Sequence, residues 1–184
     1  LAARGYYQAF QVVRDSVTKV LKGKNPGTVV DDDHRTWYRE LFAPSITAGL
    51  LQAADLAGYR NGPVYIRRSM HTPPNREAVR DLMPAFFDLL THEPDPAVRV
   101  VLGHFMFVYI HPYMDGNGRI GRFLMNVMLA AGGYPWTVIP VEERNAYMAA
   151  LEAASVGEDI LPFADFLGTL VKANLHGKSA PTVP

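Results

Sequence analysis

Residues 97–110 constrain the fold of this chain more than any other segment, because they are apolar on almost every side of a helix. Such a helix is stable in water only where other elements surround it, so we expect it in the centre of a core. The next segment, residues 117–131, has apolar side chains at helical spacing: Ile120, Phe123, Leu124, Val127 and Met128. This spacing predicts an amphipathic helix that ends at Gly132-Gly133.

Most of the remaining chain also has helical periodicity. We expect further helices at about residues 1–22, 34–57, 76–91, 141–154 and 160–174. The exception is residues 62–74, where Val64 and Ile66 alternate with Tyr65 and Arg67, a period of two that favours a short β-hairpin. The sequence therefore predicts a mostly α-helical bundle with one short hairpin.

The composition excludes several classes of protein. Lys plus Arg and Asp plus Glu both number 18 in 184 residues, a balance that argues against a dedicated nucleic-acid binder. The chain has no cysteine, which excludes disulfides, zinc–thiolate sites and thiol catalysis. No apolar run reaches the roughly 18 residues that span a bilayer, so we expect no membrane segment and a cytoplasmic location. The chain begins at Leu1 rather than Met, so we expect further sequence upstream.

One segment between the apolar and the amphipathic helix combines groups suited to phosphoryl chemistry: His111-Pro112-Tyr113-Met114-Asp115-Gly116-Asn117-Gly118-Arg119-Ile120-Gly121-Arg122. Glycines at a helix start leave backbone N–H groups open to a phosphate. Arg119 and Arg122 share one helix face and suit a polyphosphate. Asp115 offers the hard oxygen that Mg²⁺ prefers beside nucleotide phosphates. His111 can accept a proton near neutral pH. An Asp-Gly-Asn-Gly sequence alone is commonly only a turn, but the joint pattern predicts a site.

This segment resembles the signature of the Fic family, His-Pro-Phe-x-Asp/Glu-Gly-Asn-Gly-Arg-x-x-Arg, with Tyr113 in place of the phenylalanine. Upstream, residues 59–74 resemble the hairpin that the family calls the flap. The resemblance covers about residues 36–170. It implies a single Fic domain over residues 1–184, with a core at about 36–170, an N-terminal helical extension at 1–35 and a short polar tail at 175–184.

The resemblance implies a protein AMP transferase, which moves AMP from ATP to a hydroxyl side chain of a target protein with Mg²⁺. His111 would be the general base and Asp115 would hold the metal. The phosphates would be bound by Gly116, Asn117, Gly118, Arg119 and Arg122. The flap, chiefly Val64, Tyr65 and Ile66, would bind the target as an added β-strand. Asn126 and Tyr147 are candidates for the adenine pocket, and a core or surface role of Tyr147 is the alternative.

Other readings of the same residues stay open at this point. The family includes a branch that transfers phosphate, which typically replaces the first or second glycine after the acid, so Gly116 and Gly118 favour AMP transfer. Other nucleotide or phosphodiester donors are possible, because the signature reads phosphates rather than bases. A silent nucleotide-binding module is a third reading, against which the intact His111 and Asp115 argue.

Regulation is also suggested by the resemblance. Many family members are held inactive by a helix with Ser/Thr-x-x-x-Glu-Gly/Asn, whose glutamate pairs with a signature arginine. No glutamate of this chain is followed by Gly or Asn. We therefore expect any inhibitory helix, or an antitoxin-like partner, to lie outside this chain.

Overall fold

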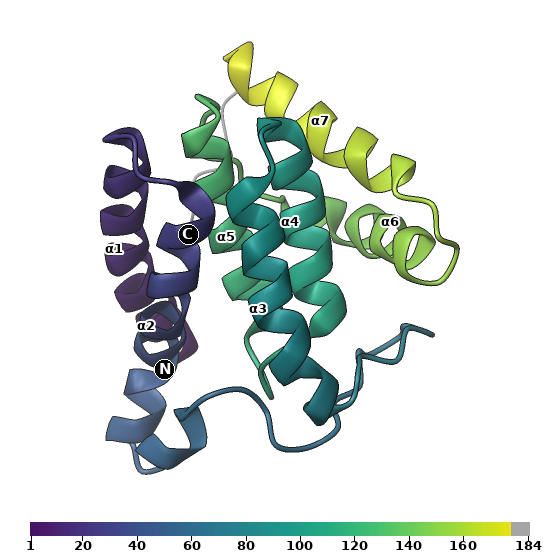
Figure 1. Cartoon of the computed structure of the whole chain (residues 1–184). Coiled ribbons are helices and arrows are strands. Elements are labelled where there is room, and N and C mark those ends of the chain that lie inside the picture. Colours follow the sequence, from purple (N-terminus) through teal and green to yellow (C-terminus); the bar gives the residue numbers. More distant parts are fainter. Residues whose placement is uncertain (178–184) are drawn as a thin grey trace.

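The computed structural model describes residues 1–177, which fold into helices packed around one core (Figure 1). In chain order these are α1 (Ala2–Leu21), α2 (Pro26–Thr47), the short 3₁₀ helix η1 (Ala53–Leu56), α3 (Arg76–His92), α4 (Pro96–Ile110), α5 (Asn117–Ala131), the 3₁₀ helix η2 (Val141–Glu143), α6 (Arg144–Ser155) and α7 (Leu161–Leu175). The predicted mostly helical fold is confirmed. Most of the predicted polar tail, residues 178–184, lies outside the described residues.

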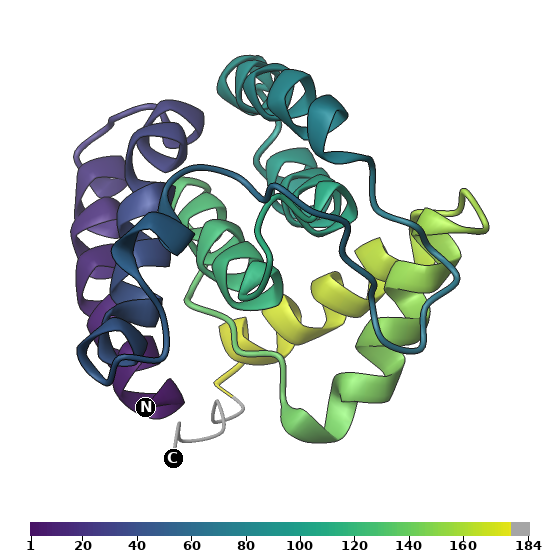
Figure 2. The same ribbon diagram turned by 90° about the horizontal axis from the view of Figure 1, so that it is seen from below.

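Helices α4 and α5 form the centre of the molecule. Figures 1 and 2 show α1 and α2 on one side of this pair and α6 and α7 on the other, with α3 beside α4. Phe107 of α4 and the five predicted apolar residues of α5 are fully buried. The central place of α4 agrees with its apolar composition, although Leu102 and Tyr109 each remain 38% exposed at one edge. Within residues 1–177, no helix has the length and apolar character to cross a bilayer.

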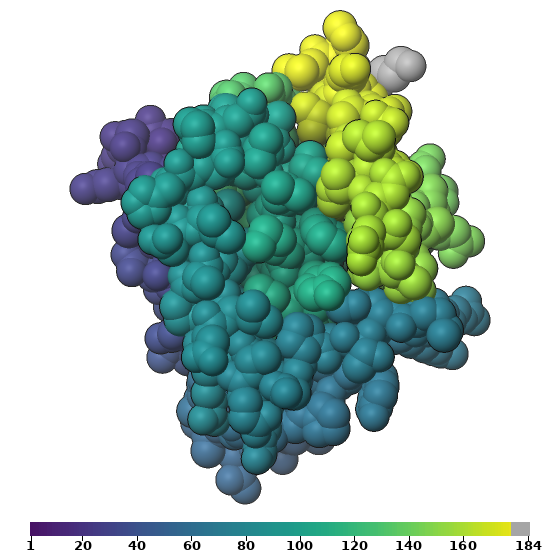
Figure 3. Space-filling model, turned by 45° about the vertical axis from the view of Figure 1, so that its right-hand side comes forward, coloured from purple at the N-terminus to yellow at the C-terminus, as the bar shows by residue number. Residues whose placement is uncertain are grey.

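The predicted β-hairpin is wrong for the described chain, because residues 62–74, here called the flap, contain no strand. The predicted alternation itself is present: Val64 and Ile66 are half-buried, while Tyr65 and Arg67 are exposed. A hairpin also requires cross-strand hydrogen bonds, and the flap's own backbone bond closes a tight turn, from Ser69 N–H to the Ile66 carbonyl. The flap is held by other parts of the chain, and it meets the α6–α7 side of the surface in Figure 3.

The second helix also differs from its prediction at residues 34–57, because it starts and ends earlier. Asn25 caps α2, since its side-chain oxygen accepts hydrogen bonds from Gly27 N–H (2.9 Å) and Thr28 N–H (3.2 Å). Pro26 occupies the first helical position, where a missing N–H does no harm. The sequence around Asn25-Pro26 therefore reads as a break but forms a helix start. Gly49, in the left-handed region (φ +72°), follows the helix end.

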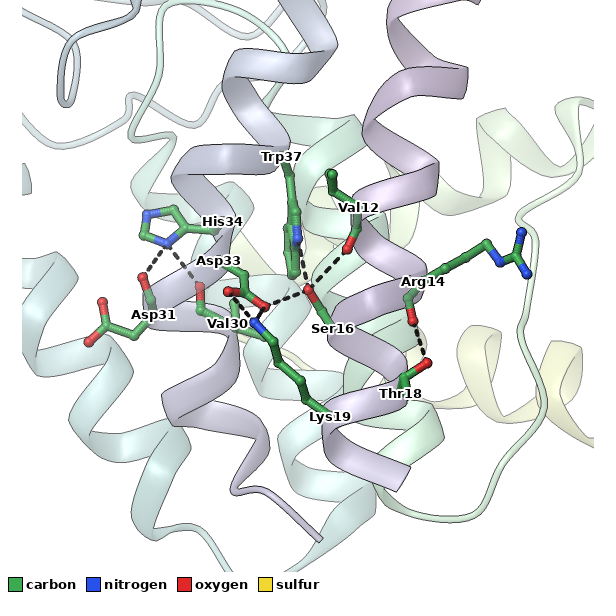
Figure 4. Close-up of polar contacts among 10 residues, drawn as sticks. All are labelled: Val12, Arg14, Ser16, Thr18, Lys19, Val30, Asp31, Asp33, His34 and Trp37. Carbon is green, nitrogen blue, oxygen red and sulfur yellow. Dashed lines mark hydrogen bonds and ion pairs between the residues drawn. The ribbon is translucent and has the colours of Figure 1, made fainter. Parts of the chain in front are cut away.

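Helices α1 and α2 are joined by a partly buried polar network, drawn in Figure 4. The indole N–H of Trp37 donates to the Ser16 hydroxyl (3.1 Å), which donates to the Asp33 carboxylate (2.7 Å). Lys19 pairs with the same carboxylate at 2.8 Å. The two backbones also approach closely at Gly5, where an added Cβ would lie 2.0 Å from the Leu41 carbonyl oxygen. These contacts fix α2, which carries aromatic side chains toward residues 111–116.

Candidate active site

The predicted signature borders a cavity of about 760 Å³. Its wall combines the flap, the cavity-facing parts of α4 and α6, the start of α5 and the signature loop, defined here as residues 111–116. The polar part includes His111, Asp115, Arg119 and Arg122, and Gly116, Asn117 and Gly118 also line it. The structure therefore brings the predicted base, metal ligand and phosphate-binding residues to one cavity.

His111 is the C-terminal cap of α4 and adopts a left-handed backbone conformation (φ 53°, ψ 60°), which is uncommon for a residue other than glycine. Its Nδ1 lies 2.9 Å from the Val108 carbonyl oxygen, so Nδ1 carries the hydrogen and Nε2 is the unprotonated nitrogen of the neutral ring. Within residues 1–177, Nε2 has no hydrogen-bond partner. Burial lowers the pKa of His111, and the nearby Arg60 adds to this effect while the Val108 bond opposes it. The imidazole is thus neutral and oriented at neutral pH.

The signature loop is held by the side chain of Asn117. Its Oδ1 accepts from Tyr113 N–H (2.9 Å), and its Nδ2 donates to the Tyr113 carbonyl (2.8 Å). Tyr113 is 1% exposed and stacks on Tyr38 with ring centroids 3.8 Å apart. The tyrosine therefore fills the aromatic position of the signature. Both the oxygen and the nitrogen of the Asn117 amide group bond to the loop, while its backbone N–H lies outside the helical ladder and is open to a ligand.

The start of α5 has the open backbone amides that the sequence predicted. The first helical hydrogen bond runs from Ile120 N–H to the Gly116 carbonyl (3.0 Å), and no side chain caps the helix. The N–H groups of Asn117, Gly118 and Arg119 precede that bond and have no place in the helical ladder. Gly116 has φ +82°, and an added Cβ would lie 3.0 Å from the Phe42 ring, so any other residue would be strained there.

Asp115 lies at the cavity with its side chain 74% exposed. One carboxylate oxygen accepts from Gly116 N–H (2.6 Å) and the other pairs with Arg119 at 3.2 Å. In the described part of the chain there is no group of three or more His, Asp or Glu residues that could hold a metal alone. Mg²⁺ bound together with nucleotide phosphates needs only one or two carboxylates, so the exposed Asp115 beside the open amides fits such an ion.

The flap covers one side of this cavity. Tyr65 and Ile66 line it, whereas Val64 is not among the lining residues, and Tyr65 is 84% exposed. The flap is held in its middle by Glu152 of α6, whose carboxylate accepts from the Ser69 hydroxyl and from Met70 N–H (2.7 Å). His71 donates to the Tyr109 carbonyl over 2.9 Å.

The two predicted adenine-pocket residues lie in different surroundings. Tyr147 lines the cavity but is only 6% exposed, and its hydroxyl lies 2.6 Å from Nε2 of the buried His104. Asn126 does not line the cavity. Its amide bonds to the Arg122 carbonyl (3.0 Å) and to the backbone of Thr137 (2.7 and 3.0 Å). The structure thus brings Tyr147 but not Asn126 to the site, and an adenine contact of either residue stays a prediction.

Sequence reasoning missed other residues of the site. Its apolar wall includes Phe105, Val108, Ile139, Met148 and Leu151. Helical periodicity predicted the helices that carry most of these residues, but not which of their faces lines a cavity. Glu152 and Arg60, which bind the flap and the signature loop, also carried no signal, because each acts on residues far away in the sequence.

Residues 31–129, more than half of the chain, match the family model described as the Fic/DOC family. The chain belongs to this family. Protein adenylyltransferase Fic of Nematostella vectensis is 38% identical to this Fic/DOC chain over 128 residues, which are 67% of the chain and 29% of the relative. Protein adenylyltransferase fic-1 of Caenorhabditis elegans is 34% identical over 121 residues, 64% of the chain and 23% of the relative. The matched region spans less than a third of these curated relatives.

Solved structures agree with the assignment. Fic-1 from C. elegans superposes with a TM-score of 0.76 at 26% identity, over 95% of this Fic/DOC chain and 49% of the solved one. A Fic domain containing signaling protein from Bacteroides thetaiotaomicron gives a TM-score of 0.73 at 21% identity, over 92% of this chain and 70% of the solved one, and this similarity shows the fold alone.

Proposed function

We propose that this Fic/DOC chain transfers AMP from ATP to a hydroxyl side chain of a target protein. The observation that carries the proposal is the oriented imidazole of His111, whose Nε2 has no hydrogen-bond partner within residues 1–177. His111 lines the same cavity as Arg122 and the residues with open amides at the start of α5. A base and a phosphate-binding helix start in one cavity suit the transfer of a phosphorus group to a hydroxyl. The names of the curated relatives support adenylyl as the group transferred.

In the proposed reaction, the phosphates of ATP bind at Gly116, Asn117 and Gly118, where the N–H groups of Asn117 and Gly118 are open, and they bind the guanidinium groups of Arg119 and Arg122. Asp115 would hold Mg²⁺, which would neutralise phosphate charge when bound. Nε2 of His111 takes the proton of the target hydroxyl as the hydroxyl oxygen forms a bond to the α-phosphorus. The bond from the α-phosphorus to the oxygen that bridges to the β-phosphorus breaks, and pyrophosphate leaves.

The flap is the proposed contact for the target. The backbone groups of Val64 and Tyr65 make no hydrogen bond within residues 1–177, so they are open to pairing with an added strand. The absence of a hairpin in the flap leaves these groups without an internal partner. Ile66 follows this open backbone and lines the cavity, where it would contact the residue beside the modified hydroxyl.

The test uses ATP radiolabelled at either the α- or the γ-phosphate, a mixture of candidate target proteins, and three forms of the chain. Wild-type protein should transfer the α-label and not the γ-label. His111→Ala should lower the rate by about 10²–10⁴, the usual value of a general base, without loss of ATP affinity. His92→Ala, at an exposed histidine of α3, is the matched control and should behave as wild type. Transfer of the γ-label, or full activity of His111→Ala, would contradict the proposal.

A further inference from the structure

We propose that Arg60 is a positioning residue that holds the backbone of His111 and both ends of the flap in one fixed arrangement. Through this arrangement it sets the distance between the base and the bound target segment. The inference rests on the proposed function for its effect on catalysis, and on the contacts of one buried guanidinium for its structural part.

Arg60 is only 4% exposed, and within residues 1–177 no carboxylate lies near enough to form an ion pair with it. Its guanidinium donates to four backbone carbonyls: those of His111 (Nε, 2.7 Å), Gly62 (Nη1, 3.1 Å), Pro74 (Nη2) and Ile110 (Nη2, 3.4 Å). Its own backbone N–H donates to the Pro112 carbonyl (2.9 Å). One residue thereby joins the end of α4, the start of the signature loop and the first and last parts of the flap.

The chemistry of this place explains why it holds an arginine. The carbonyls of Ile110 and His111 stand at the C-terminus of α4, where unpaired carbonyls and the helix dipole favour a positive charge. A buried cation without a carboxylate is otherwise costly, and burial does lower the pKa of Arg60. The planar fork of five N–H groups can reach three chain segments at once, whereas a lysine ammonium is a single point charge on a flexible stem.

Two contacts hold the base, one at its ring and one at its backbone carbonyl. Val108 fixes Nδ1 of His111, while Arg60 fixes the carbonyl of the same residue, which lies in the uncommon left-handed conformation. The same guanidinium donates hydrogen bonds to both ends of the flap, while Glu152 accepts hydrogen bonds from its middle. Loss of Arg60 would therefore free the base and the target-binding segment together. Arg119 and Arg122, the proposed phosphate-binding side chains, lie on α5. Neither is among the hydrogen-bond partners of Arg60.

The experiment compares Arg60→Lys, which keeps the charge but loses the fork, with Arg60→Gln and with Arg14→Lys at an exposed arginine of α1 as the matched control. In Arg60→Lys, kcat/KM for target modification should fall about 10- to 100-fold, as expected when reacting groups are misplaced by around an ångström. The ATP dissociation constant should stay within about twofold of wild type, because the phosphate site on α5 is intact. Arg14→Lys should change neither quantity.

A second measurement separates this inference from the proposed function. Amide hydrogen exchange should become faster in Arg60→Lys and Arg60→Gln at the hydrogen-bonded amides of two segments, the flap (Ser69, Met70 and His71) and the C-terminal cap of α4 (His111), while the cores of α1, α5 and α7 exchange as in wild type. This readout does not depend on AMP transfer, so a wild-type chain without transferase activity would refute the proposed function alone. Unchanged exchange in these segments would overturn the role of Arg60. Equal losses of ATP affinity and of target modification would also overturn it, because they would indicate general loosening of the domain.

Discussion

Replacing Asn117 with alanine should destabilise the whole domain, although the sequence pattern suggests a role in binding the nucleotide. Asn117 is 2% exposed, and its amide group bonds to both backbone groups of Tyr113, which is itself 1% exposed. Alanine leaves the Tyr113 N–H and carbonyl buried without these partners. The side chain therefore acts on the loop, while only the backbone N–H of residue 117 is free to act on a phosphate.

The size of the effect follows from these two bonds. A buried donor or acceptor that loses its partner destabilises a protein by about 1–3 kcal/mol, and the two groups here belong to one peptide region, so we expect about 2–4 kcal/mol in total. For a domain of this length, each kcal/mol lowers Tm by about 2–4 °C, which gives a decrease of about 5–15 °C. The open amides at the start of α5 should still form once the variant is folded.

Thermal and urea unfolding of wild type, Asn117→Ala and Asn61→Ala would measure this effect. Asn61 is an exposed asparagine whose side chain makes one long contact with Arg80 (3.4 Å), so its alanine variant should stay within about 0.5 kcal/mol of wild type. ATP binding is then measured by calorimetry well below the Tm of each variant. A wild-type Tm for Asn117→Ala, combined with lost ATP affinity, would refute the reasoning, because the side chain would then act on the nucleotide.

Three further predictions follow from the same contacts. Burial lowers the pKa of His111, so the neutral base persists below its usual range and kcat/KM should decline only below about pH 6.5; a decline that begins at higher pH would be inconsistent with this. Glu152→Ala should reduce target labelling at unchanged ATP affinity, because the flap loses the carboxylate that accepts from Met70 N–H. Glu142→Ala, at an exposed glutamate, should leave labelling unchanged, and equal labelling by both variants would rule this out. Gly5→Ala should lower the free energy of unfolding by about 1–3 kcal/mol, because the added methyl group clashes with α2. Gly168→Ala in α7, where an added Cβ meets nothing within 4 Å, should be neutral or stabilising, and chemical unfolding of both variants measures the difference.

Helices were predictable where the apolar period was unbroken. Residues 117–131 show this best, because the pattern from Ile120 to Met128 and the two glycines after it leave one consistent solution, and α5 has these bounds. The start of α2 was not predictable in the same way, because Asn25-Pro26 suits a turn and a capped helix start equally well. Packing decides between them: the Asn25 side-chain nitrogen also donates to the Thr91 carbonyl of α3, 66 positions away (2.9 Å). Sequence periodicity carries no information on a contact of that kind.

The flap shows the same limit at the site. Alternation of apolar and polar residues correctly predicted which side chains of residues 64–67 are exposed, because alternation follows from a partly buried chain. The alternation does not determine which groups form hydrogen bonds with the backbone of the flap. These groups are the side chains of Glu152 and Arg60 rather than a second strand. The motif, in contrast, correctly predicted that the site residues of the signature meet at one cavity, because they follow one another from the end of α4 through the signature loop into the first turns of α5.

The distance between base and phosphate site is set by the core as well as by the signature loop. His104, one turn and a half before the end of α4, donates through Nδ1 to the Gly121 carbonyl of α5 (2.8 Å) and accepts through Nε2 from the Tyr147 hydroxyl of α6 (2.6 Å). Burial lowers the pKa of His104 to about 4, so the ring is neutral at neutral pH and can make both bonds in these directions. Helix α4 ends in the proposed base, and Gly121 lies beside Arg122 of the proposed phosphate site. The His104 bridge therefore holds α4, which ends in the proposed base, against α5, which carries the proposed phosphate site. The signature loop only connects two helices whose relative position the core already fixes.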